Sequence, residues 1–252
     1  MNKNFVNRVP HIILIYWVIK IASTTLGETG ADMFSMTFNL GYGETIIIFI
    51  SLFLLLLAVK LRIKKYNPVA YWAVFTATAI VGTGISDFID RTLGLGYAAG
   101  ALILVIMLLI ILALWYSKEK SISVELITTG SAEIYYWTAF LIANTLGTAA
   151  GDFLADSLGF GFLLSAGIIT GMLIVTILLH YFTKTSKIVL FWIAFVLTRP
   201  FGATFGDLLT KPIELGGINL GTIGASIFFA VVLVFAVIKE TKMEKLRTNQ
   251  NF

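Results

Sequence analysis

Four aspartates recur in this sequence at a fixed distance behind a tryptophan and a glycine. In each copy glycine follows tryptophan by ten residues and aspartate follows it by fifteen, without a gap. The four sets are Trp17/Gly27/Asp32, Trp72/Gly82/Asp87, Trp137/Gly147/Asp152 and Trp192/Gly202/Asp207. Each carboxylate lies inside or at the end of a very apolar segment, where an ionised acid is costly unless it has a function or a partner. Four equivalent acids therefore predict one shared site.

The residues at offsets 4, 7, 11 and 15 from each tryptophan fall on one stripe of a regular helix. This stripe carries most of the strongly polar residues at depth, and Lys20 lies near its edge. Besides the aspartates, its members include Glu28, Thr83, Asn144, Thr148 and Arg199. A polar stripe on a membrane helix faces the interior of a bundle or a water-filled cavity. We therefore expect the four motif segments to surround a common axis.

The charges on this stripe predict that the site holds protons or a cation. Five acids, which are Glu28 and the four aspartates, face only Arg199 and Lys20, so three negative charges are in excess if all groups ionise. Such an excess is hard to sustain in a medium of low dielectric constant. Oxygen ligands from the acids, Asn144, Thr83 and Thr148 suit a hard or borderline divalent ion or a monovalent cation. No resident cofactor is required.

Each motif residue also has a simpler interpretation. An aspartate near a helix end caps a following turn through backbone N–H groups in many proteins. Tryptophan at a membrane boundary is often an interfacial anchor, and small residues commonly allow helices to pack closely. Arg199 either neutralises a buried acid such as Glu28 or acts as a counter-ion that a transported cation displaces.

The composition indicates that membrane-spanning segments position these polar residues. The chain has 252 residues, of which 58% are hydrophobic and 13% are charged. This charged fraction is about half that of soluble domains, which indicates an integral membrane protein. The absence of cysteine excludes disulfides and thiolate metal sites. Eight apolar segments, each near the ~20 residues that span a bilayer, cover roughly residues 11–36, 45–62, 69–91, 97–116, 133–156, 161–181, 188–210 and 218–238.

The segments form a repeat of two, in which a motif segment is followed by a segment rich in Leu, Ile, Val and Phe. The tryptophans are 55, 65 and 55 residues apart, as expected for a pair of units that was duplicated once more. The repeats cover approximately residues 11–65, 66–120, 131–185 and 186–240 of a single transmembrane domain, 1–252. We predict an all-α membrane protein with eight transmembrane helices, arranged as four parallel two-helix repeats around a pseudo-symmetric axis.

A glycine-containing turn follows the first three motif segments, and the fourth copy departs from it. The turns read Leu40-Gly41-Tyr42-Gly43, Leu93-Gly94-Leu95-Gly96 and Leu158-Gly159-Phe160-Gly161. The fourth copy has Leu215-Gly216-Gly217 after additional charged residues. Tight outer turns of this kind favour glycine. Strict fourfold function is therefore not expected.

The basic residues predict the orientation in the membrane. Fourteen of them flank the apolar segments on one side, and only Arg91 and Lys211 lie on the other. They are Lys3, Arg8, Lys60, Arg62, Lys64, Lys65, Lys118, Lys120, Lys184, Lys187, Lys239, Lys242, Lys245 and Arg247. Because cytoplasmic loops carry the excess of Lys and Arg, both termini should be cytoplasmic. The same short basic segments explain the net charge of +4, so we expect no nucleic-acid partner.

The repeats resemble those of a bacterial family of uncharacterised, membrane-anchored, multi-pass proteins. That family is defined by four tandem repeats of unknown function, each with two membrane segments and a characteristic tryptophan. The tryptophans Trp17, Trp72, Trp137 and Trp192 match it, and the resemblance covers essentially the whole chain. It implies eight helices in a bacterial inner membrane, and it supplies no catalytic or binding residues.

Several functions are compatible with this sequence. The leading hypothesis is a transporter of a cation, such as a divalent metal that is exported, with the four aspartates as its site. The alternatives are a proton-coupled carrier of a small organic solute, and a membrane anchor or assembly protein that transports nothing. We do not expect an enzyme, because the sequence contains no paired nucleophile and base, zinc-protease motif or phosphate-binding loop. The expected partners are the lipid bilayer and a cation, proton or solute, and the oligomeric state is open.

Overall fold

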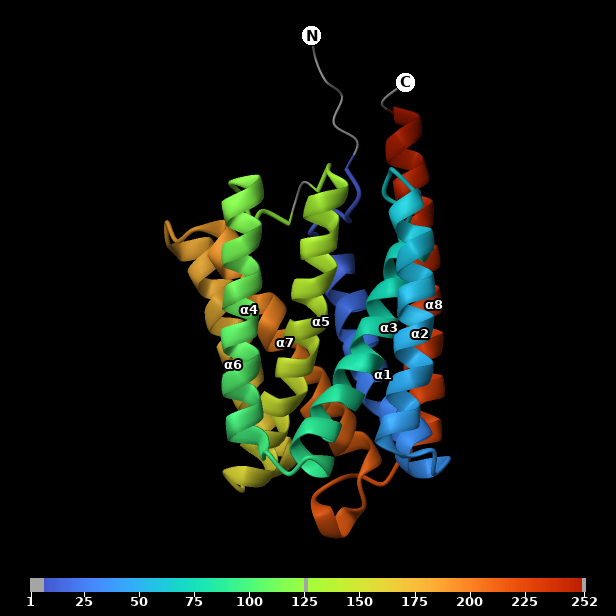
Figure 1. The fold of residues 1–252 in the computed structure, drawn as a ribbon, viewed down its shortest axis with the longest axis vertical. Helices are drawn as coiled ribbons and strands as arrows, with labels where there is room; N and C mark the ends of the chain where they lie inside the picture. Colours follow the sequence, from blue (N-terminus) through green and yellow to red (C-terminus); the bar gives the residue numbers. More distant parts are fainter. Residues whose placement is uncertain (1–6, 125–126, 251–252) are drawn as a thin grey trace.

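The structure is a computed structural model that describes residues 7–124 and 127–250, and it is all-α (Figure 1). The four helices that carry the motif are α1 (Leu14–Asp32), α3 (Pro68–Asp87), α5 (Gly130–Asp152) and α7 (Lys187–Thr210). The other four are α2 (Gly41–Arg62), α4 (Tyr97–Glu119), α6 (Gly161–Phe182) and α8 (Thr222–Gln250). Lys3, one of the basic residues used to predict the orientation, lies outside the described residues.

Local sequence sets the start of two motif helices. Asn67 precedes Pro68, the first residue of α3, and its side-chain oxygen accepts a hydrogen bond from the backbone N–H of Ala70 at 2.9 Å. Thr129 does the same for α5 by accepting from the N–H of Ala132 at 3.0 Å. Such caps satisfy backbone donors that a helix start leaves free, and proline is favoured in the first turn.

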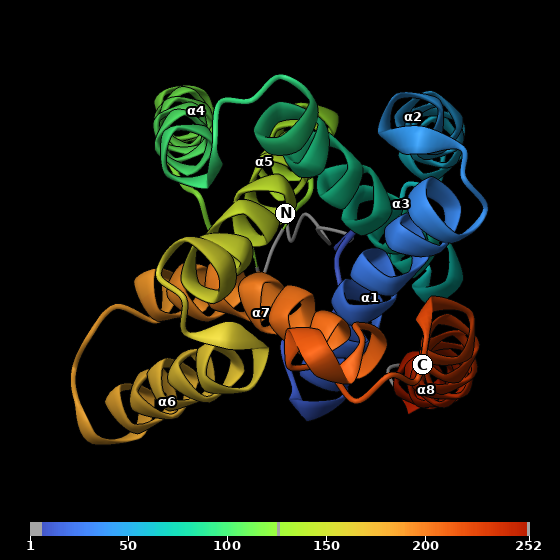
Figure 2. The ribbon, with the colours of Figure 1, turned by 90° about the horizontal axis from the view of Figure 1, so that it is seen from below.

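The four motif helices form a closed ring. Helix α1 contacts α3 and α7, and α5 contacts the same two helices from the other side (Figure 2). Each outer helix packs against the motif helix of the following repeat, so that α2 lies on α3, α4 on α5 and α6 on α7. The last outer helix, α8, returns to α1. The two helices of one sequence repeat are therefore not the two that pack together. Because α8 packs on α1, the last helix of the chain completes the bundle by contacting the first.

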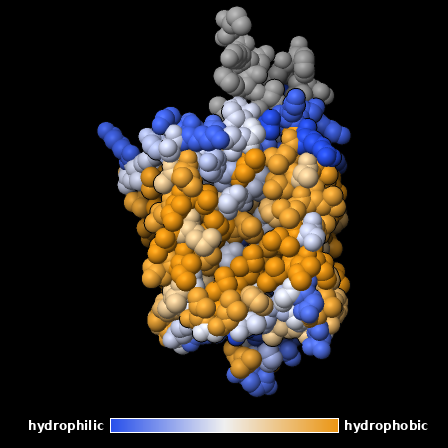
Figure 3. All heavy atoms as spheres, in the orientation of Figure 1, coloured by the Kyte–Doolittle hydropathy of each residue, from blue (hydrophilic) through white to orange (hydrophobic). Residues whose placement is uncertain are grey.

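Six helical segments of the described chain are long and apolar enough to cross a membrane. They are Gly41–Arg62, Pro68–Thr92, Tyr97–Glu119, Gly161–Phe182, Lys187–Thr210 and Thr222–Arg247. Helices α1 and α5 are not among these six, and both contain buried charged side chains. These are Lys20, Glu28 and Asp32 in α1 and Glu133 and Asp152 in α5. On the face seen in Figure 3, a broad apolar belt lies between two hydrophilic ends. These features support the predicted all-α membrane class.

Aromatic side chains fill the ring at the end where the motif tryptophans lie. The residue before each tryptophan and the residue three positions after it point into the interior and are buried. The first layer consists of Tyr16, Tyr71, Tyr136 and Phe191, and the second consists of Lys20, Phe75, Phe140 and Phe195. The rings of Phe75 and Phe195 lie 6.3 Å apart although they belong to opposite helices of the ring. The axis is therefore closed by packed side chains at this depth.

Three of the four motif tryptophans are not interfacial anchors. Trp72 and Trp137 are 1% exposed and Trp192 is 8% exposed. The indole N–H of Trp72 donates to Glu240 of α8 at 2.5 Å, and that of Trp192 donates to the carbonyl of Ile122 at 3.2 Å. The interfacial interpretation is wrong for these residues because each one packs inside the protein, where it joins neighbouring elements.

The motif glycines allow the ring helices to approach closely, as predicted. Each glycine faces the residue that lies seven positions after the tryptophan of the next helix around the ring. The pairs are Gly27 with Ala79, Gly82 with Asn144, Gly147 with Arg199, and Gly202 with Thr24. A Cβ atom on Gly27 would lie 2.5 Å from the Cβ atom of Ala79, which is far inside van der Waals contact. Glycine is thus required at the four helix crossings.

The outer turns of the first three repeats share a conformation, but the predicted alignment of the first turn is wrong. A π-helical turn follows α1, α3 and α5, over Met33–Thr37, Phe88–Thr92 and Phe153–Ser157. Two residues with positive φ then follow, which are Asn39 and Gly41, Gly94 and Gly96, and Gly159 and Gly161. Asn39 takes the place of the first glycine because asparagine tolerates the left-handed region. Gly41, not Gly43, is therefore the equivalent of Gly96.

Candidate functional site

The four repeat aspartates and Glu28 gather at the end of the ring opposite the aromatic layers; we call them the acid cluster. Asp32, Asp87 and Asp152 are the last residues of their helices, and Asp207 lies in the last turn of α7. All five residues are buried, and each whole residue, backbone included, is only 2–3% exposed. Carboxylate oxygens of Glu28, Asp32 and Asp207 lie within 4.8 Å of one another. This trio has the spacing of carboxylates that could share one cation.

The aspartates do not act as caps. Asp32, Asp87 and Asp152 precede the π-helical turns, and none of their side chains accepts a capping hydrogen bond. Their backbone angles are helical, so that each helix runs through the aspartate without an end at which a cap is needed. The capping interpretation is wrong for these three acids, and their position needs another explanation.

Two basic residues that the sequence analysis assigned only to topology bridge the aspartates in pairs. The Nε atom of Arg91 lies 3.1 Å from Asp87 Oδ1, and its Nη2 atom lies 3.4 Å from Asp152 Oδ2. The Nζ atom of Lys211 lies 2.6 Å from Asp32 Oδ2 and 3.2 Å from Asp207 Oδ1. Each basic residue thus bridges two repeat aspartates. One lies four positions before it on its own helix, and the other lies on the next motif helix around the ring.

The sequence contained a signal for this pairing. Arg91 and Lys211 both stand nineteen residues after a motif tryptophan, in the second and fourth copies, and they are 120 residues apart like the duplicated halves. The first and third copies have Met36 and Asp156 at this offset. The fourfold motif therefore has a twofold charge pattern. Residues four apart on a helix are neighbours, but the pairing follows only if the helix continues past the aspartate.

Lys211 is held between two acids at the edge of the protein. Burial lowers the pKa of Lys211, but the carboxylates of Asp207 and Asp32 raise it more, so that its net pKa lies above the ordinary value for lysine. The side chains of Lys211 and Arg91 are 16% and 32% exposed, whereas the aspartates that they bridge are 3–4% exposed. The acid cluster is therefore reached past these two basic side chains.

Arg199 crosses the interior of the ring one turn deeper than the aspartates. Its Nη1 atom lies 3.2 Å from Glu28 Oε2 on α1, and its Nη2 atom donates to the carbonyl of Ala79 at 3.3 Å and to the hydroxyl of Thr83. Because α3 is opposite α7 in the ring, this guanidinium lies across the axis. Thr83 also donates to Glu28 Oε2 at 3.2 Å. The predicted contact between Arg199 and Glu28 is confirmed, and it separates the acid cluster from the aromatic layers.

Lys20 lies in the aromatic layer, away from the acid cluster. Its ammonium donates to the carbonyl of Phe195 at 3.0 Å and to the hydroxyl of Thr198, and it lies 3.9 Å from the centroid of the Phe195 ring. Within the described chain, no carboxylate lies within ion-pairing distance of it. Lys20 precedes Glu28 by eight residues, a rise of about 12 Å on a helix. The expectation that Lys20 offsets the acids is wrong.

The charge balance at the acid cluster changes accordingly. Five carboxylates meet three basic side chains, which are Arg91, Arg199 and Lys211. Two negative charges are therefore in excess if all groups ionise, and not three as the sequence predicted. The excess is smaller but still resides in buried groups, where an uncompensated charge is costly.

Asn144 and Thr148 lie one turn apart on α5, and Thr148 is one turn before Asp152. The amide of Asn144 donates to the hydroxyl of Thr78 at 2.9 Å. The Asn144 Oδ1 and Thr148 Oγ1 atoms are buried and have no hydrogen-bond partner among the described residues. Buried polar atoms normally have a partner, so these two oxygens can still bind a ligand. Of the three neutral residues predicted near the site, only Thr83 contacts an acid directly.

Comparison with known proteins identifies the repeats. One family model matches the chain four times, over residues 15–66, 70–121, 135–186 and 190–245, and its description is Repeat of Unknown Function (DUF347). No curated protein and no solved structure matches the chain.

Proposed function

The chain belongs to this repeat family, and from the site that it carries we propose that it transports a cation across the bacterial inner membrane. In this proposal all eight α-helices span the bilayer, as four parallel two-helix repeats around a pseudo-symmetric axis, with both termini cytoplasmic. The single observation that carries it is the acid cluster, in which five buried carboxylates from all four repeats meet only three basic side chains.

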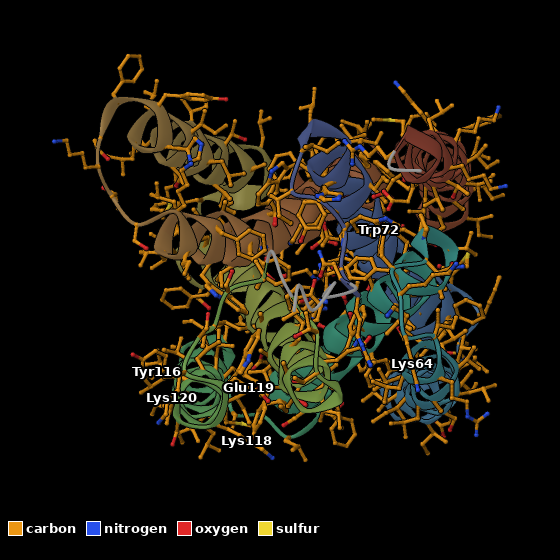
Figure 4. All side chains as sticks on the ribbon, turned by 90° about the horizontal axis from the view of Figure 1, so that it is seen from above. Lys64, Trp72, Tyr116, Lys118, Glu119 and Lys120 are labelled. Atoms are coloured by element: carbon orange, nitrogen blue, oxygen red, sulfur yellow. The ribbon has the colours of Figure 1, made fainter. Side chains whose placement is uncertain are left out.

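The proposed orientation rests on the distribution of charge. Seen from the end at which α1 begins and α8 ends, Lys64, Lys118 and Lys120 lie on the rim of the bundle (Figure 4). The acid cluster lies at the opposite end, beyond the aromatic layers. Because basic residues are retained on the cytoplasmic side, the cluster faces the periplasm. The aromatic layers and Arg199 then close the cytoplasmic half of the axis.

The substrate of this site is a hard or borderline cation, with an exported divalent metal as the leading candidate. Carboxylate and hydroxyl oxygens are the ligands that such ions prefer. Glu28, Asp32 and Asp207 offer three oxygens within 4.8 Å of one another. Lys211 already places an ammonium between two of these acids. A divalent ion that enters the trio displaces this ammonium toward solvent, which lowers the excess of negative charge at the acid cluster from two to one.

Transport of cations by the purified protein tests the proposal. We would reconstitute the full chain into liposomes and measure the flux of protons, Na⁺, K⁺, Mg²⁺, Mn²⁺ and Zn²⁺. The variant Asp32→Asn/Asp207→Asn should abolish the flux of the transported ion, since it removes two of the three charged ligands. Asp156→Asn is the matched control, because this aspartate is exposed and belongs to the π-helical turn Phe153–Ser157, outside the acid cluster. Undiminished flux in a folded Asp32→Asn/Asp207→Asn protein would refute the proposal.

A second candidate is a proton-coupled carrier of a small organic solute. It is favoured by Lys20, a buried amine that shares a layer with three phenylalanine rings and has no acid at ion-pairing distance within the described chain. Here the acids carry protons, and the amine and the rings contact the solute. Proton flux that a solute induces without any metal would support this carrier against the metal exporter. A protein that moves no ion or solute in either assay would be an anchor or assembly partner.

A further inference from the structure

A groove on the outer surface of α3 results from the way the ring closes. Helix α2 packs against α3, whereas α8 packs against α1 and also contacts α3 (Figure 2). The two outer helices thus flank α3 without covering it. The groove between them has a volume of about 390 Å³. Its walls include Leu52 and Leu56 of α2, Ala73 and Ala77 of α3, and Val234 and Val237 of α8.

The groove ends at a polar layer near the start of α3. Trp72 lines the groove, and its indole N–H donates to Glu240 Oε2 at 2.5 Å. The hydroxyl of Tyr66, in the connection between α2 and α3, donates to the other oxygen of Glu240 at 2.7 Å. Both oxygens of this buried carboxylate are therefore occupied, and the connection is fastened to α8. An apolar groove that ends at such a layer reaches the boundary between hydrocarbon and headgroups.

Basic residues surround this end of the groove. The end of α2 and the following connection carry Arg62, Lys64 and Lys65, all exposed, and the end of α8 carries four more basic residues. These four are Lys239, Lys242, Lys245 and Arg247. Against seven basic residues stand two acids, Glu240 and Glu244, so the net charge of the two segments is +5. The Tyr66–Glu240 hydrogen bond brings both basic segments to the same place.

We propose that this groove binds one acyl chain of an anionic phospholipid, whose headgroup is held by the basic residues of α8 and of the α2–α3 connection. The apolar walls match a hydrocarbon chain, and basic residues at the cytoplasmic face attract anionic headgroups. A partner helix does not fit, because a helix with its side chains is about 10 Å wide and the groove is only about 390 Å³ in volume. The bound lipid fastens α8, which closes the ring, to α3.

Lipid binding to the purified full chain tests this proposal. We would measure by native mass spectrometry the binding of phosphatidylglycerol and phosphatidylcholine with identical acyl chains. Phosphatidylglycerol should bind the more tightly. The variant Lys64→Ala/Lys239→Ala, with one residue from each segment, should weaken its binding by roughly tenfold or more. Lys184→Ala/Lys187→Ala, which removes two exposed basic residues from the α6–α7 connection and the start of α7, should bind like the wild type.

A second variant tests the groove itself. Ala73→Phe fills the groove and should remove the tightly bound lipid, whereas Ile174→Phe, on the exposed face of α6, should not. Unfolding temperatures establish that the variants are folded. Equal binding of the two lipids, or equal lipid binding by Ala73→Phe and Ile174→Phe, would overturn the proposal. So would a protein dimer that Ala73→Phe dissociates, since a second copy would then occupy the groove.

Discussion

Replacing Gly27 with alanine should force apart α1 and α3, two helices of the inner ring. The added Cβ atom would lie 2.5 Å from the Cβ atom and 2.9 Å from the carbonyl carbon of Ala79. The carbonyl carbon belongs to the backbone and Ala79 has no side-chain rotamer to change, so the helices themselves must move. Overpacking of this kind costs about 1–3 kcal/mol. Alanine recovers about 1 kcal/mol through its higher helix propensity, which leaves a net loss of up to about 2 kcal/mol.

Thermal unfolding in detergent measures this loss against a matched control. In Gly171→Ala, on α6, the new Cβ atom meets no heavy atom within 4 Å, so this variant should be as stable as the wild type or more stable. For a chain of this size 1 kcal/mol corresponds to roughly 2–4 °C. Gly27→Ala should therefore unfold several degrees below Gly171→Ala. Equal unfolding temperatures for the two variants would refute the inference that the motif glycines are needed for close packing.

Three further substitutions test the contacts of the acid cluster and of the motif tryptophans. Arg91→Met should destabilise the fold by about 3–5 kcal/mol, since it leaves two buried carboxylates unpaired. Adding Asp87→Asn and Asp152→Asn to this variant removes both unpaired charges and should restore part of the lost unfolding temperature. Lys211→Met should raise the affinity for the transported cation in a binding titration, because it removes a competing ammonium; a lower affinity would contradict displacement of Lys211. Trp72→Phe should cost about 1–3 kcal/mol of unfolding free energy by removing a donor to buried Glu240. Trp137→Phe should cost less, since its indole N–H has no hydrogen-bond partner among the described residues.

The sequence predicted the parts of the fold that depend on local periodicity. The offsets from each tryptophan place the polar stripe and the aspartates inside the ring, because a helix repeats every 3.6 residues. The close approach at Gly27 followed from the same pattern. The sequence did not predict that each outer helix packs on the motif helix of the next repeat. A short connection allows an outer helix to pack on either of two neighbouring motif helices.

The sequence could not show how the acids are neutralised. Arg91 reaches Asp87 only because α3 continues through a π-helical turn, and helix ends are the least certain part of a sequence-based prediction. The position of Lys20 near the edge of the polar stripe predicts a counter-charge for the acids, but eight residues of helix separate it from Glu28 along the axis. The shared offset of Arg91 and Lys211 is visible in the sequence, but the aspartate of the neighbouring helix that each one bridges is seen only in the packed ring.

Cation-dependent stability of the purified protein tests the central claim, that the acid cluster is a cation site. A ligand at one hundred times its dissociation constant stabilises a protein by about 2.7 kcal/mol. At least one cation should raise the unfolding temperature of the wild type and of Asp156→Asn in a saturable manner, and leave folded Asp32→Asn/Asp207→Asn unchanged. The claim is contradicted if no cation stabilises the wild type, or if the double variant is stabilised to the same extent.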